Sequence, residues 1–113
     1  MIKINFSGHH VVGFVVAPFV GINLPMDGAA LVSTVREIIL ALPGRNELLA
    51  GAAAEVILPG ISQAAGVLLA EWHGEFGSFP SIRWAVRTSA GFEWPETAIT
   101  DLAAVRESAR TAR

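Results

Sequence analysis

Residues 55–87, EVILPGISQAAGVLLAEWHGEFGSFPSIRWAVR, contain the pattern that decides the fold. The short apolar run 55–58 is closed by Pro59-Gly60, which is typical of a strand buried on both faces. Apolar side chains then recur at helical spacing from Ile61 to about Gly74, and residues 81–87 alternate again. A strand, a helix and a second strand in this order predict a βαβ unit with parallel strands.

The N-terminal half contains the same kind of pattern. Residues 2–6 alternate and predict a strand that ends in a Ser-Gly turn, and the β-branched residues 11–16 predict a second extended segment. Asp27 can cap a helix whose apolar face continues to Leu42, where Pro43-Gly44 ends it. The connector 45–53 is expected to hold one helical turn.

The C-terminal part adds a further strand over residues 92–99, with Pro95 at an edge or a bulge. Thr100-Asp101 can cap a last helix that ends in a basic tail. Alternating strands and helices joined by short turns predict one three-layer α/β domain over residues 1–113, with a largely parallel sheet.

The composition is unusually apolar for a chain of this length. Hydrophobic residues make up 52% and charged residues 16%, and the mean hydropathy is +0.51. This excludes disorder for most of the chain, and we expect part of the excess to be covered by a second copy of the chain. There is no cysteine, so thiolate chemistry and disulfides are excluded, which fits a reducing, cytoplasmic location.

A membrane is a poor explanation for the apolar residues. Residues 4–26 carry no formal charge, but Pro18, Gly21 and Pro25 interrupt the segment, and its oily part, residues 11–22, is too short to span. The net charge of −2 provides no global field for duplex nucleic acid or anionic lipid. We therefore expect neither a membrane nor duplex nucleic acid as a partner.

Two turns are candidates for a ligand site, because ligands of open parallel sheets bind beyond the carboxyl ends of the strands. The first is Asn5-Phe6-Ser7-Gly8-His9-His10, where Gly8 allows a sharp turn next to one hydroxyl and two imidazoles. The second is Pro59-Gly60-Ile61-Ser62-Gln63, where a helix start offers free N–H groups to a phosphate. Each of these residues taken alone also fits an ordinary turn or cap.

Arg83 and Arg87 share one face of the alternating segment 81–87, and they are either a solvated face or a phosphate clamp. Adjacent histidines without nearby carboxylates are a weak metal signal, so we expect neither a metal nor a cofactor. The chain lacks GxGxxG, GxxxxGK[ST], HExxH and GxSxG, which removes the main support for dinucleotide, nucleoside-triphosphatase, zincin and esterase chemistry.

Three segments together resemble a family of small CRISPR-associated proteins of type III systems. Residues 4–9 (INFSGH) are similar to that family's opening NFS-H. Residues 68–80 (LLAEWHGEFGSFP), followed by Ile82-Arg83, resemble its LLAELHG--G-FP helix exit and I-R strand. Residues 101–106 (DLAAVR), with Ala109-Arg110, resemble its closing NLQAVR--AR. The chain departs from the pattern at Gly8, and at His10 where the family tends to have proline.

The resemblance implies a Rossmann-like domain related to the CARF sensors, working as a homodimer that binds a cyclic oligoadenylate across its two-fold axis. Some relatives in antiviral defence cleave this messenger as metal-independent ring nucleases, and others act as sponges that hold it and lower its free concentration. Cyclic tetra-adenylate fits a symmetric dimer, and because binding demands less of the sequence than cleavage, we place sequestration first. By matching position it implies that ligand contacts come from Asn5, Ser7, Gly8 and His9, and from Pro59, Gly60 and Ser62, with Arg83 less directly placed. Gln63, at the predicted helix start, is added as a ligand-binding residue because its side chain can supply a hydrogen bond there.

Alternative functions remain open at this point. A metal-independent ring nuclease would use His9 or His10 on the attacking 2′-hydroxyl or on the developing charge. A dimerisation module would use the turns only as turns and the apolar surface as an interface. A metabolic enzyme on the same scaffold would use His9 or His10 in acid–base chemistry.

Overall fold

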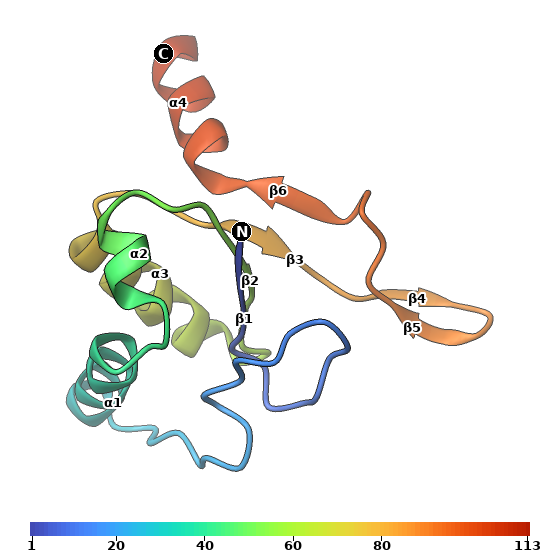
Figure 1. Ribbon diagram of the computed structural model, residues 1–113, viewed down its shortest axis with the longest axis horizontal. Helices are drawn as coiled ribbons and strands as arrows, with labels where there is room; N and C mark the ends of the chain where they lie inside the picture. Colours follow the sequence, from blue (N-terminus) through green and yellow to red (C-terminus); the bar gives the residue numbers. More distant parts are fainter.

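The computed structural model describes all residues 1–113 and has α/β architecture (Figure 1). Its main sheet has four strands in the order β1-β2-β3-β6, of which the first three are parallel and β6 is antiparallel to β3. The strands are β1 (Ile2–Asn5), β2 (Ala54–Ile57), β3 (Ser81–Arg83) and β6 (Ile99–Asp101). The helices are α1 (Gly28–Leu40), α2 (Arg45–Leu49), α3 (Ser62–Phe76) and α4 (Leu102–Ala112). The predicted α/β class with a largely parallel sheet is confirmed.

The helices begin where the sequence indicates, but α1 ends at Leu40, before the predicted Leu42, and α3 continues to Phe76, beyond the predicted Gly74. Asp27 caps α1 by accepting a hydrogen bond from the Ala30 N–H at 3.0 Å, and Asp101 caps α4 through Ala103 and Ala104. Gly77 ends α3 in the left-handed conformation with φ of 74°, which a side chain would disfavour. The predicted helical turn in the connector is α2.

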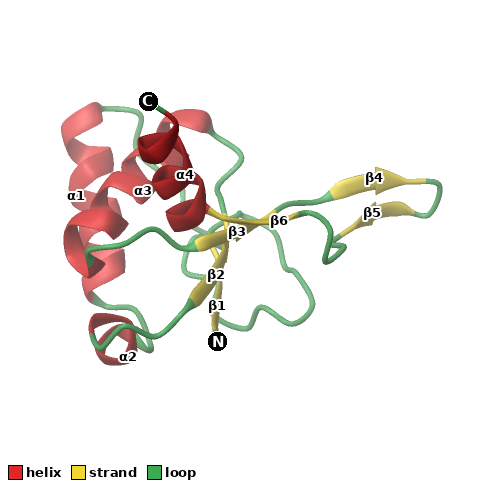
Figure 2. Cartoon of the chain, turned by 90° about the horizontal axis from the view of Figure 1, so that it is seen from above, coloured by secondary structure: helices red, strands yellow, loops and turns green.

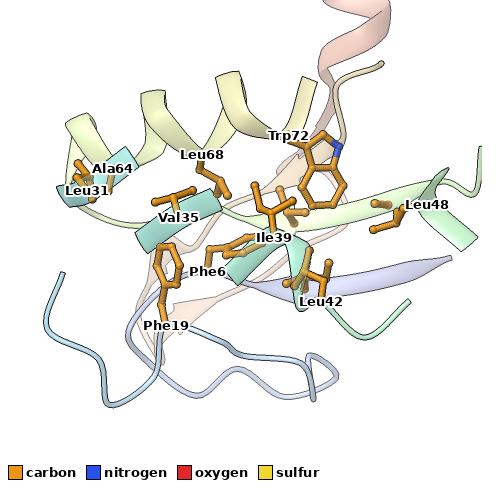
Figure 3. Packing of buried hydrophobic residues seen from close by; sticks show 13 residues of the cluster. Phe6, Phe19, Leu31, Val35, Ile39, Leu42, Leu48, Ala64, Leu68 and Trp72 are labelled. Carbon is orange, nitrogen blue, oxygen red and sulfur yellow. The ribbon is translucent and has the colours of Figure 1, made fainter. Parts of the chain in front are cut away.

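The helical core lies on one face of the sheet (Figure 3). Ile4 and Val56 from the strands pack with Val35 of α1 and Leu68 of α3, and all four are 1% exposed or less. Phe6 and Trp72 meet edge to face with ring centroids 6.3 Å apart. Burying this cluster is the main source of stability, because apolar burial is the dominant favourable term in folding.

Ion pairs join the outer surfaces of the same helices. The Arg36 side chain donates two hydrogen bonds to the Glu71 carboxylate at 3.0 and 2.7 Å, and Arg45 pairs with Glu75. Hydrogen bonding to Glu71, together with its charge, raises the pKa of Arg36 above its ordinary value. The contact therefore favours the charged form of Arg36, and it requires the Glu71 carboxylate to be deprotonated.

The three layers predicted from the sequence are not completed by helices. Because the order β1-β2-β3 runs in one direction, crossovers of the usual right hand place α1 and α3 on the same face. Figure 2 shows α1, α2 and α3 gathered on one side of the strands. Loop segments around Val11 and Phe14 cover part of the other face, and α4 buries none of its residues.

Three strand predictions differ from the structure. Residues 11–16 are a turn with a single bridge, between Val16 and Ile4, because Gly13 takes a φ of 87° and interrupts the extended run. The segment 81–87 splits after Arg83 into β3 and β4 (Val86–Thr88). The segment 92–99 splits into β5 (Gly91–Glu93) and β6, since Pro95 offers no N–H and accepts a turn bond from Ala98.

β4 and β5 pair only with each other and form a hairpin that projects from the body (Figure 1). Phe92, on β5, is 68% exposed. Isolated two-stranded hairpins are marginally stable in water, so this element depends on additional contacts for a fixed position. No helix of the chain is both long enough and apolar enough to cross a bilayer.

Candidate functional site

A cavity of about 380 Å³ opens where the carboxyl ends of β1, β2 and β3 meet. Six of the ten predicted site residues line it: Ser7, Gly8, His9, Pro59, Gly60 and Arg83. The rest of the wall comes from the segments that flank the projecting hairpin (Trp84, Ala85 and Trp94) and from the strand ends (Ile57, Leu58 and Ile82). The two predicted turns therefore do converge, as expected for the same edge of a parallel sheet.

Asn5 holds the first loop in shape and is itself fully buried. Its Oδ1 accepts hydrogen bonds from the Ser7 N–H at 2.8 Å and the Ser7 hydroxyl at 2.6 Å, and its Nδ2 donates to the His9 carbonyl. This is an Asx-type turn, which the Asn-x-Ser spacing could have indicated. In this structure Asn5 is a positioning residue for Ser7 and His9.

Gly8 and Gly60 face the cavity without being required by the backbone. Neither has a φ in the left-handed region, and a Cβ added at either would meet no atom within 4 Å. The chain bends at Gly8 as predicted, but this bend does not depend on the conformational freedom of glycine. Their lack of a side chain leaves the backbone open to whatever enters the cavity.

The Arg83 side chain is mostly buried and is paired with a carboxylate. Its Nε lies 3.0 Å from Oε1 of Glu55, and its Nη1 donates to the Trp94 carbonyl at 3.4 Å. The Glu55 side chain is 2% exposed, and its Oε2 has only Lys3 near it, with Nζ at 3.8 Å. A buried carboxylate thus balances the Arg83 charge, which reduces its value as a phosphate clamp.

Arg87 does not share the face of Arg83, because the strand breaks between them; its guanidinium lies 5.7 Å from the centroid of the Phe92 ring. The predicted shared face of Arg83 and Arg87 is wrong.

His9 and His10 are both exposed and make no ion pair with a carboxylate. His9 lines the cavity, while His10 lies beside it and faces a neighbouring one. No three His, Asp or Glu side chains come together in a way that could hold a metal ion. The site chemistry available to this chain is therefore that of amides, imidazoles and aromatic rings.

Ser62 and Gln63 lie on the first turn of α3 and do not line the cavity. Both are exposed: the Ser62 hydroxyl lies 3.5 Å from Oε1 of Gln63, and Nε2 of Gln63 lies 3.8 Å from the Met26 sulfur. The helix start itself has no side-chain cap, so its first N–H groups are available to solvent or to a ligand.

Of the three tryptophans, only Trp72 lies in the hydrophobic core. Trp84 is 43% exposed and lines the cavity with Trp94. No Asp or Glu lies among the lining residues. The cavity therefore combines two indoles, glycine backbone and one imidazole, a set suited to a flat, anionic ligand.

Comparisons with protein-family profiles, with curated proteins and with solved structures find no match to this chain. The family resemblance of residues 4–9, 68–80 and 101–110 stays a prediction drawn from the sequence.

Proposed function

We propose that this chain is a Rossmann-like, CARF-related domain that binds a cyclic oligoadenylate, cyclic tetra-adenylate foremost. It acts in the cytoplasm as a homodimer and lowers the free concentration of this messenger by sequestration in type III CRISPR antiviral signalling. One observation carries the proposal: both predicted loops, together with two tryptophans, line a single cavity that has no carboxylate in its wall.

The glycine backbone supports binding of a phosphodiester. Gly8 and Gly60 lack side chains where a Cβ would meet only open space, so a ligand can approach their backbone closely. Gly60 also precedes the uncapped start of α3, whose N–H groups favour an anion. Because Arg83 is paired with Glu55, phosphate recognition in this proposal comes from amides and imidazoles.

A homodimer follows from the size of the ligand. A single cavity of about 380 Å³ is at the lower end of the range for small-molecule sites, roughly 300–1,000 Å³. A ring of four adenylates is larger and has two-fold symmetry, so two copies of the chain would each enclose half of it. Val12 and Val15, which are almost fully exposed on the loop after His10, offer apolar surface for such an interface.

Calorimetric titration of the intact protein with cyclic tetra-adenylate tests the proposal. We expect micromolar or tighter binding, with one ring for every two chains. The Gly8→Ala and Gly60→Ala variants should fold normally and bind at least tenfold more weakly, because each added methyl occupies ligand space. Gly66→Ala is the matched control: it lies on an exposed part of α3, meets no atom within 4 Å and lines no cavity. Absence of binding at micromolar concentrations contradicts the proposal.

Cleavage of the ring is the alternative, and the position of His9 in the cavity wall favours it. The 2′-hydroxyl of one ribose would give its proton to an imidazole and attack the adjacent phosphorus. The new 2′-oxygen–phosphorus bond forms a 2′,3′-cyclic phosphate, the bond from phosphorus to the 5′-oxygen breaks, and the 5′-oxygen takes up a proton. Neither His9 nor His10 is oriented by a carboxylate, so we place sequestration first. Incubation of labelled ring with excess protein decides this: a linear product that His9→Ala or His10→Ala abolishes identifies a ring nuclease.

A dimerisation module without ligand is the further alternative, and the exposed apolar side chains of residues 12, 15, 84 and 92 favour it. A dimer in light scattering that shows no heat of binding with the ring would support this function over the other two.

A further inference from the structure

A second cavity, of about 480 Å³, adjoins the first. The two cavities share four lining residues: Ser7, His9, Ala85 and Trp94. We name them the first lobe, which alone includes Trp84, and the second lobe, which alone includes His10, Val11 and Phe92. The shared walls make them two compartments of one groove at the tip of the first loop.

The second lobe has the same chemical character as the first. Phe92 is 68% exposed, and its ring has no partner in the hydrophobic core. The exposed imidazoles of His9 and His10 stand on the opposite loop, and no Asp or Glu lines this lobe. A phenyl ring and an indole at the wall bind flat heteroaromatic rings by stacking.

We infer that each chain binds two linked nucleobases, one in each lobe, so that its minimal ligand is a dinucleotide. The first base lies against Trp84 and the second against Phe92, with Trp94 contributing to both lobes. This inference rests on the proposed function and specifies how one chain would engage half of a four-base ring.

The phosphate that links the two bases is assigned to the junction, where Ser7 and His9 line both lobes. The Ser7 hydroxyl already donates its hydrogen to Asn5 Oδ1 at 2.6 Å. The His9 imidazole and the Trp94 indole N–H are therefore the side-chain groups at the junction that remain able to donate a hydrogen bond to the phosphate.

Titration of the full-length protein with AMP, with adenylyl-(3′→5′)-adenosine and with cyclic tetra-adenylate tests the inference. We expect the dinucleotide to bind at least tenfold more tightly than AMP, as a second stacked base predicts. Phe92→Ala and Phe92→Leu should remove that advantage and weaken AMP binding far less than dinucleotide binding, because the first lobe, which lacks Phe92, still binds one base. Trp84→Ala should weaken both ligands.

Val86→Ala is the matched control, because Val86 lies on the same hairpin and lines neither lobe. Circular dichroism of each variant shows whether the protein still folds. Phe92→Leu keeps an apolar side chain in the hairpin, so weaker dinucleotide binding by this variant reports the loss of stacking.

The outcomes separate the inference from the proposed function. Binding of the ring with equal affinity for AMP and the dinucleotide, or with no effect of either Phe92 substitution, overturns the two-lobe inference and keeps the function. The expected dinucleotide pattern without binding of the ring supports the inference and overturns the proposed messenger. No binding of any of the three ligands overturns both.

Discussion

The two faces of the main sheet are built from different chemistry. On the helical face, 13 buried apolar residues from the strands, the helices and adjoining loop segments form one cluster. On the opposite face, Lys3, Glu55 and Arg83 form a chain of charges, and only a three-residue cluster, Val11, Phe14 and Ile57, accompanies it. One face therefore supplies most of the hydrophobic stabilisation, while the other leads into the candidate site.

The topology explains why the faces differ. Because both crossover helices lie on one side, only loops remain to cover the other. Polar side chains at that face need partners when they are buried, and Glu55 and Arg83 provide partners for each other. The same ion pair holds Arg83 at the cavity wall.

The largest loss of stability is expected from a substitution on the helical face of the sheet. Leu68→Ala should lower the free energy of unfolding by about 4 kcal/mol, because Leu68 is 1% exposed and its removal leaves a cavity between α1, α3 and the sheet. Leu49→Ala is the matched control at a leucine that is 47% exposed on α2, with a loss below about 1 kcal/mol. Urea unfolding followed by tryptophan fluorescence measures both. Equal losses would contradict the dominance of the helical face.

The next largest loss of stability is expected among the charged side chains of the opposite face, Lys3, Glu55 and Arg83. Arg83→Ala should cost about 3 kcal/mol, because it leaves the Glu55 carboxylate buried with only Lys3 nearby. The double variant Glu55→Met/Arg83→Met should cost less than Arg83→Ala, since neither charge remains to be solvated. Urea unfolding of the two variants and the wild type gives the comparison. A double variant that is less stable than the single one would show that the pair itself is a net source of stability.

The contrast between the faces also marks what the sequence could predict. Local signals sufficed for α1 and α3, because apolar periodicity runs through each helix and a glycine or a proline follows it, and Asp27 also caps the start of α1. The parallel pairing of β1 and β2 followed from the βαβ pattern. The convergence of the first and second loops followed from the same topology.

The remaining features depend on contacts between residues far apart in the chain. The alternation over residues 81–87 continues past Arg83, so nothing in it marks the point where the chain leaves the sheet for the hairpin. Glu55 sits in an otherwise apolar run, and its partnership with Arg83 becomes visible only when β2 and β3 are adjacent. The β-branched residues at 11–16 indicated a strand, but the positive φ of Gly13 overrides that preference.

A smaller loss of stability is expected where the opposite face of the sheet meets the first loop, residues 5–10. Asn5→Ala should cost about 2 kcal/mol, because it removes the acceptor for the Ser7 N–H and hydroxyl and the donor to the His9 carbonyl in a buried position. It should also weaken ligand binding by releasing His9 from its place in the wall. Asn23→Ala, at an exposed asparagine, is the control and should change the stability by less than about 0.5 kcal/mol. Urea unfolding and ring titration measure the two quantities. A fully stable Asn5→Ala protein would contradict a positioning role.

The smallest effect on stability is expected at the aromatic rim. Phe92→Ala should change the free energy of unfolding by less than about 0.5 kcal/mol, because Phe92 is 68% exposed and belongs to neither hydrophobic cluster. Urea unfolding measures this change, and a loss above 1 kcal/mol would contradict it by showing that the hairpin is packed against the body. A large aromatic side chain that adds little to folding and yet forms one wall of a cavity is better explained by a ligand than by the core. The stability of this variant and its affinity for the dinucleotide are therefore expected to move independently, whereas for Leu68→Ala both should fall together.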